Sequence, residues 1–273
     1  MTVITRSFGA ALAALAITAT LGACGSEKAG TSTESSSSSK PAAEAPKTKV
    51  GDEVDLSAVF TETAAAMKAK KSYAFTGETP EGAMSGQMRV DGDTTAMKIE
   101  ATMEGEKATI LFVDGAMYMG GMPDLPAGKT FIKIDPNADD PMSKMMAPFL
   151  SQMAESADPT TGLANIKGLK AKVVEVKDGT TTYEATLTAQ QQLEMAKKSL
   201  EDMGMGDEPM PTPSAAMKPI TVRQTIGADN LPTKIELSGS AESTMTLTYS
   251  GWGAPVDVVA PPADKVASFS DMM

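Results

Sequence analysis

Thr95-Ala96-Met97-Lys98-Ile99-Glu100-Ala101-Thr102-Met103 is a stretch in which apolar and polar side chains alternate. The apolar set that shares one face comprises Met97, Ile99, Ala101 and Met103, and the other face carries Lys98, Glu100 and Thr102. A period of two is typical of a β-strand that buries one face. The stretch therefore predicts a sheet with one apolar surface.

The same alternation recurs from Ser72 onward and predicts about eleven strands. Asp-Gly pairs at 91–92, 114–115 and 178–179 tolerate the positive φ angles of tight hairpin turns. Most connections are too short for crossover helices, so we expect neighbouring strands to run antiparallel.

Three amphipathic helical segments interrupt the strands. The first runs from Leu56 to about Lys71 behind Asp55 as N-cap, and its inward stripe comprises Leu56, Val59, Phe60, Thr63 and Met67. The third begins with Thr188 and Gln191 in capping-box spacing and ends at Gly204. Its inward residues are Leu193, Ala196, Leu200 and Met203.

The second segment begins at Asp140-Pro141, a cap followed by a proline at the first helical position. Its apolar stripe comprises Met142, Met145, Met146, Phe149, Leu150 and Met153, and Pro148 breaks or kinks it. Because three such segments need an apolar surface to cover, we expect an α+β fold with one open antiparallel sheet and helices on one face. A closed β-barrel with peripheral helices is the alternative.

The N-terminus predicts export and anchoring. An apolar run from Phe8 to Leu21 follows Arg6 and ends in Leu21-Gly22-Ala23-Cys24, which is typical of a lipobox. Residues 1–23 are then a signal peptide, and acylated Cys24 anchors the chain to the outer face of the cytoplasmic membrane. An ordinary cleaved signal with an incidental cysteine is the alternative.

Downstream of the anchor, the Ser- and Pro-rich residues 24–51 predict a disordered tether. One domain is expected over 52–268, with a tail at 269–273. Because Cys24 is the only cysteine, this domain has no internal disulfide.

Composition excludes several functions. The chain has 24 Lys+Arg against 35 Asp+Glu and a net charge of -11, which disfavours binding to nucleic acid. It has no histidine, which removes histidine-dependent catalysis and histidine zinc ligands. Asp135, Asp139 and Asp140 could serve carboxylate catalysis, but acidic residues at such a junction are more often caps and turns. We therefore expect no enzyme.

The same acidic run resembles the start of a calcium loop, with oxygens at Asp135, Asn137 and Asp139. It departs from that pattern where Asp140 replaces the glycine and Met146 replaces the bidentate glutamate, so no metal or other cofactor is expected. The chain also has 21 methionines. Clustered methionines favour a filled core, an adaptable apolar ligand cavity or a Cu(I) site, and their helical spacing disfavours the copper site.

Four stretches resemble one known family: residues 66–73, 173–183, 227–235 and, most specifically, Tyr249-Ser250-Gly251-Trp252-Gly253-Ala254-Pro255-Val256-Asp257-Val258 followed by Ala260-Pro261-Pro262. The chain resembles the LppX/LprAFG family of actinobacterial lipoproteins, related in fold to the LolA and LolB carriers, from Leu56 to about Val266. The resemblance implies a half-open, curled antiparallel sheet around an apolar cavity, covered by helices. It also implies a role in carrying or presenting acylated lipids.

We therefore interpret the chain as a binding protein for a lipid or another amphiphile. The candidate cavity residues are Val59, Phe60, Met67, Met97, Ile99, Ala101, Met103, Met142, Met145, Met146, Phe149, Leu150, Met153, Leu193 and Leu200. Two alternatives stay open: an adaptor lipoprotein with a filled core that acts through a protein partner, and a Met-rich Cu(I)-binding envelope protein. The sequence names neither the ligand nor any envelope transporter partner.

Overall fold

The computed structural model describes residues 48–91, 94–103, 105–123, 125–140, 143–147, 150, 169–202, 218–239, 244–268 and 271. The signal peptide, Cys24, most of the expected tether and most of the expected tail lie outside the described residues.

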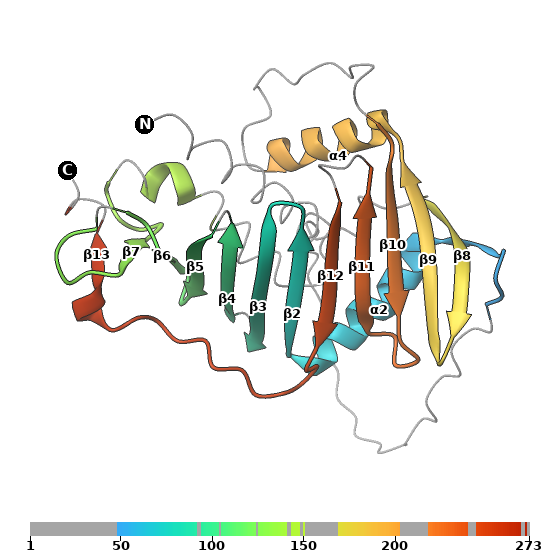
Figure 1. Ribbon diagram of the computed structural model, residues 1–273, viewed down its shortest axis with the longest axis horizontal. Helices are drawn as coiled ribbons and strands as arrows, with labels where there is room; N and C mark the ends of the chain where they lie inside the picture. The colour runs from blue at the N-terminus through green and yellow to red at the C-terminus, as the bar shows by residue number, and fades with distance from the viewer. Residues whose placement is uncertain are drawn as a thin grey trace, which may run out of the picture.

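The strands form one sheet (Figure 1). They are β1 (Glu53–Asp55), β2 (Ser72–Thr79), β3 (Gly82–Asp91), β4 (Thr94–Met103), β5 (Glu106–Val113), β6 (Ala116–Gly120), β7 (Phe131–Ile134), β8 (Lys170–Lys177), β9 (Thr180–Leu187), β10 (Ile220–Ile226), β11 (Pro232–Ser238), β12 (Met245–Ser250) and β13 (Val266–Ser268). The 13 strands exceed the expected eleven. The edge strands β1 and β13 have three residues each, too few to show an alternation of period two.

The strand order is β1-β8-β9-β10-β11-β12-β2-β3-β4-β5-β6-β7-β13. Two antiparallel meanders, β2 to β7 and β8 to β12, meet where β12 pairs with β2. Among the described strands, only β13 pairs in parallel, with β7. β1 and β13 are the two ends of this order, so the sheet is open. The expected open α+β sheet is confirmed, and the barrel alternative is wrong.

Local capping places two helices where the sequence predicts them. Helix α2 (Leu56–Lys70) begins after Asp55, whose carboxylate accepts a hydrogen bond from the Ser57 amide at 3.0 Å. Helix α4 (Ala189–Asp202) begins with the expected reciprocal pair: the Thr188 amide donates to Gln191 Oε1 at 2.9 Å and the Gln191 amide donates to Thr188 Oγ1 at 3.2 Å.

The second expected helix is described over residues 143–147 and at 150, and a short 3₁₀ helix η3 (Ala263–Lys265) precedes β13. Asp140 caps the second helix as predicted, because its Oδ1 accepts a hydrogen bond from the Ser143 amide at 2.8 Å. Within the described residues, no helix is both long and apolar enough to cross a membrane.

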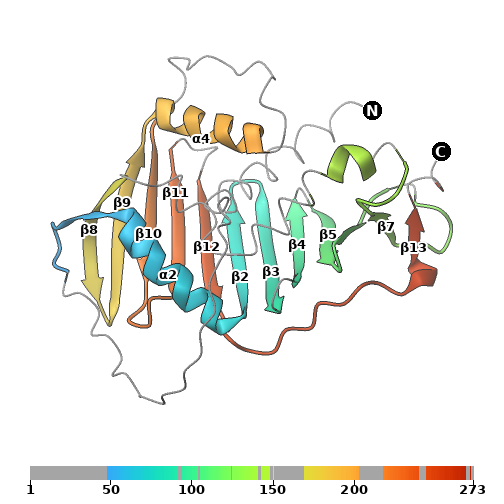
Figure 2. The same cartoon turned by 180° about the vertical axis from the view of Figure 1, so that it is seen from behind.

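One face of the sheet, here called the helix face, carries α2 and the segment 143–150. Helix α2 crosses this face diagonally over the β9 to β12 end, whereas α4 lies along the ends of these strands (Figure 2). Under α2 lies a packed cluster of Leu56, Ala171, Val173, Tyr183, Ala185 and Ile226, joined by half-buried Val54, Val59, Phe60 and Leu169. Under the segment 143–150 lies a second cluster of Phe112, Met117, Ile134 and Leu150, joined by half-buried Met97, Ile110, Met119 and Met146.

The opposite, outer face has its own apolar cluster over β4 to β7. Val256 and Val258 of the C-terminal segment cover it, in contact with a group that includes Ala96, Leu111 and Val113. Figure 1 shows this segment running from β12 to η3 past one end of the intervening strands.

Two expectations about inward residues are wrong. Met145 is 67% exposed, because Ser143, Met146 and Leu150 form the stripe that faces the sheet and Met145 lies one position off it. Ala196 is exposed because α4 lies at the end of the strands and not over the face.

Candidate ligand-binding face

Among the described residues, the middle of the helix face is an apolar surface built by strands alone. Its buried residues are Phe75, Met84, Ile99, Ile235, Leu237, Met245 and Leu247, and its half-buried residues are Tyr73, Met97, Ala101, Ile110, Ile220, Val222 and Tyr249. We call this set the central apolar face. Of the described helices, none contributes a residue to it, whereas α2 contributes to the cluster on one side and the segment 143–150 to that on the other.

Small residues keep this face low. Gly86 lies directly opposite Phe75, and the Phe75 ring occupies the space where a Gly86 side chain would stand. Gly77 lies opposite Met84 in the same way, with Met84 Cγ 2.6 Å from the position that a Gly77 Cβ would take. Large side chains therefore lie along the sheet, which leaves a shallow apolar floor.

A second low region lies on β4 and β5. Ala101 pairs directly with Ala108, and its other neighbour is Met84 on β3. Two alanines side by side on one face give this part of the surface short side chains.

Four aromatic rings gather where β2 begins and β12 ends. The ring centroids of Tyr73 and Trp252 are 4.8 Å apart, those of Tyr73 and Tyr249 are 5.8 Å apart, and Tyr249 stacks on Trp252 at 6.0 Å. Phe75 lies 6.5 Å from both tyrosines. Burial raises the pKa of Tyr73 to about 12 and also raises the pKa of Tyr249, so both phenols stay protonated near neutral pH.

The structure divides the candidate cavity residues between these regions. Met97, Ile99 and Ala101 belong to the central apolar face, and Met97 also contacts the cluster that holds Met146 and Leu150.

The remaining candidates lie elsewhere. Val59 and Phe60 pack into the filled cluster under α2. Met67 and Leu193 are half-buried outside the four apolar clusters, and Met145 is exposed. Met142, Phe149 and Met153, and the side chains of Met103 and Leu200, lie outside the described residues.

The sequence prediction missed Tyr73, Tyr249 and Trp252 as site residues. A signal existed for Tyr249, which continues the alternation of Met245 and Leu247 along β12. No sequence signal indicated the cluster itself, because Tyr73 lies far from Tyr249 and Trp252 in the sequence.

The acidic residues near 135 have ordinary structural roles. Asp135 forms an ion pair with Lys133 at 2.7 Å and accepts a hydrogen bond from the Asn137 amide at 3.0 Å, contacts that lower its pKa. Asp139 pairs with Lys144 at 3.2 Å, and Asp140 caps the following helix. Over the part of the chain that the structure describes, no three His, Cys, Asp or Glu residues form a candidate metal site.

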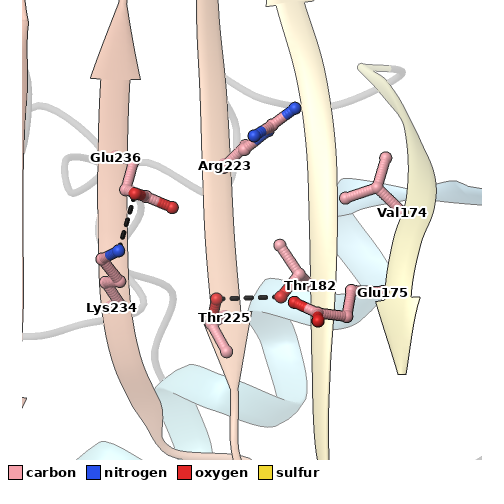
Figure 3. Close-up of a pocket in the computed structure, with 7 residues that line it drawn as sticks. All are labelled: Val174, Glu175, Thr182, Arg223, Thr225, Lys234 and Glu236. Carbon is pink, nitrogen blue, oxygen red and sulfur yellow. Dashed lines mark hydrogen bonds and ion pairs between the residues drawn. The ribbon is translucent and has the colours of Figure 1, made fainter. Parts of the chain in front are cut away.

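A polar depression of about 340 Å³ lies on the outer face, over β8 to β11. Figure 3 shows Thr182 hydrogen-bonded to Thr225 at 2.9 Å and Lys234 paired with Glu236 at 2.6 Å. Arg223 also lines it and pairs with Glu184 at 2.7 Å. These groups satisfy one another, and the depression offers little to an apolar ligand.

The chain is similar to the lipoprotein LppX of Mycobacterium tuberculosis. That crystal structure matches 75% of this chain and 98% of its own, with 17% sequence identity and a TM-score of 0.44. No protein-family model and no curated protein sequence matches the chain.

Proposed function

We propose that the protein is an exported lipoprotein that binds a lipid or another amphiphile on the central apolar face and carries or presents it. In this proposal, acylated Cys24 anchors it to the outer face of the cytoplasmic membrane and residues 24–51 are the tether. The observation that carries the proposal is an apolar surface to which the described helices contribute no side chain.

The energetics favour an acyl ligand. Each buried methylene contributes about 0.8 kcal/mol, so a chain of about sixteen carbons gains of the order of 10 kcal/mol. This exceeds the lower estimates of about 4 kcal/mol for the freedom lost on association. A shallow floor lined by Met84, Met97 and Met245 also adapts to chains of different shape, because methionine is unbranched and flexible.

The first test is direct. The protein is purified from membranes, extracted with organic solvent and examined by mass spectrometry for lipid beyond that attached to Cys24. The delipidated protein is then titrated with a fluorescent acyl probe. A protein that carries no lipid and binds no probe contradicts the proposal.

A matched pair of variants locates the site. Ala101→Trp fills the low region beside Ala108, and we expect it to abolish probe binding with an unchanged melting temperature. The control is Thr102→Trp, at the next residue of β4, which is exposed and points to the outer face. In a filled core, Ala101→Trp would instead destabilise the fold by roughly 1–3 kcal/mol.

The adaptor alternative has one observation in its favour. The cluster under α2 is filled, with Val173 fully buried and Leu56 6% exposed. Failure of lipid extraction and probe binding, together with a lower melting temperature of Ala101→Trp, would favour the adaptor. In either case we propose a non-enzymatic role, which the structural roles of Asp135, Asp139 and Asp140 support.

A further inference from the structure

Two phenolic hydroxyls, those of Tyr73 and Tyr249, lie close together at one end of the central apolar face. Within the part of the chain that the structure describes, neither the Tyr73 nor the Tyr249 hydroxyl takes part in a hydrogen bond, and desolvation is the main influence on both groups. Tyr183 on the same face differs, because its hydroxyl interacts with Thr48 and Thr181. Both side chains are half-buried, so these two adjacent phenols, which bond to no described residue, are available to a hydrogen-bonding group of a ligand.

The surroundings define what these hydroxyls can bind. The Tyr73 and Tyr249 rings pack against each other and against Trp252, so their hydroxyls are the groups left to interact with a ligand. The Trp252 indole N–H is already used, since it donates to the Pro232 carbonyl at 3.2 Å. Because both phenols stay protonated, they are hydrogen-bond donors and suit an acceptor oxygen.

We propose that the Tyr73 and Tyr249 hydroxyls donate hydrogen bonds to the carboxylate or ester carbonyl of an acyl lipid, whose chain runs over the low floor toward β4 and β5. This inference rests on the proposed function and assigns the orientation of the ligand. Phe75 and Met84, laid over Gly86 and Gly77, form the floor between the phenols and Ala101.

The test uses the full-length delipidated protein and three probes that share a chain: hexadecanoic acid, its methyl ester and hexadecane. Trp252 is the only tryptophan and contacts Tyr73, so its fluorescence reports binding at this end of the face. Tyr73→Phe and Tyr249→Phe remove one hydroxyl each. The control is Tyr118→Phe on the outer face, in contact with the Leu111 cluster.

We expect each site variant to weaken the acid by about 10-fold or more and the ester by about 3-fold, with hexadecane unchanged. Tyr118→Phe should change none of the three. Equal binding of all probes by the site variants and the parent overturns the inference, and so does an equal loss of hexadecane, which would mean that the rings only pack.

Failure of the proposed function has a different signature, because a parent protein that binds none of the three probes contradicts lipid binding itself. If the acid alone responds, the ligand is a free fatty acid, and if the ester also responds, it is an acyl ester. Should one variant fail to fold, the other variant and the change in tyrosine absorbance on binding carry the same test.

Discussion

The ring of Phe75 lies over Gly86, its direct partner on the neighbouring strand, and fills the space that a side chain at this glycine would need. The backbone of the next strand also excludes a side chain at this position, because a Gly86 Cβ would stand 2.9 Å from the Lys98 carbonyl oxygen. The glycine on β3 thus allows the aromatic ring on β2 to lie along the sheet.

Gly86→Ala should therefore force the Phe75 ring upward. We expect the free energy of unfolding to fall by roughly 1–3 kcal/mol, the usual cost of overpacking. Urea denaturation measures this. Ser85→Ala, at the adjacent residue on the other face, is the control and should stay within about 0.5 kcal/mol. An unchanged stability in Gly86→Ala would show that the ring has another position of equal energy.

Thr63→Val tests a buried hydroxyl on α2. Thr63 is 2% exposed, and its Oγ1 has no hydrogen-bond partner among the described residues. Removing an unsatisfied buried hydroxyl avoids a desolvation cost of about 1–3 kcal/mol, so we expect a higher melting temperature. The control is Thr61→Val, whose hydroxyl donates to the Ser57 carbonyl at 2.7 Å near the surface. A destabilised Thr63→Val protein would contradict this reading.

Asp140→Ala should loosen the segment 143–147. Losing this N-cap costs about 0.5–2 kcal/mol, so the amides of this segment should exchange with solvent faster, while those of β3 and β4 are unaffected. Asp139→Ala is the control, because its carboxylate is fully exposed and its ion pair with Lys144 contributes little. In the parent protein, amide protection of this segment equal to that of β3 would contradict the expectation that the segment opens more easily than the sheet.

Alkaline pH should destabilise the protein through Tyr73. Burial raises the pKa of Tyr73 from its ordinary value of about 10 to about 12, so the folded state holds the proton more tightly than the unfolded state. Stability from this group is therefore complete below about pH 10 and is lost as the pH rises toward about 12. Melting curves across this range should show a smaller loss in Tyr73→Phe. Equal losses would assign the effect to other groups.

Cys24→Ser tests the anchor. We expect the protein to leave the membrane fraction or to stay as an uncleaved precursor, because serine has no thiol to acylate. Immunoblots of membrane and soluble fractions check this. A processed Cys24→Ser protein that stays fully membrane-bound would refute the anchor.

Local features were predictable from the sequence. The alternation around Ile99, the cap at Asp55 and the Thr188–Gln191 capping box depend on residues within a few positions of one another, and all three are present. The phase of the segment 143–147 was not predictable, because one turn of helix does not fix whether Met145 or Met146 faces the sheet.

Non-local features were also beyond the sequence. No local pattern indicates that β12 lies beside β2, and the group of Tyr73, Tyr249 and Trp252 exists only because of that pairing. The shallow apolar floor also depends on strand pairing, since Gly86 makes room for the Phe75 ring only because the two residues are direct partners. The sequence therefore predicted the apolar face but not the two tyrosine hydroxyls at one end of it.

The pairing of β12 with β2 also constrains how the protein folds. Thr246–Ser250 must meet Ala74–Glu78, and the paired residues are 168 to 176 positions apart in the sequence. Long-range pairing of this kind is slow because loop closure comes before any stabilising contact. Until then the edge of β2 stays open to other chains. During synthesis, the meander β2 to β7 is therefore exposed to aggregation until β12 has been made.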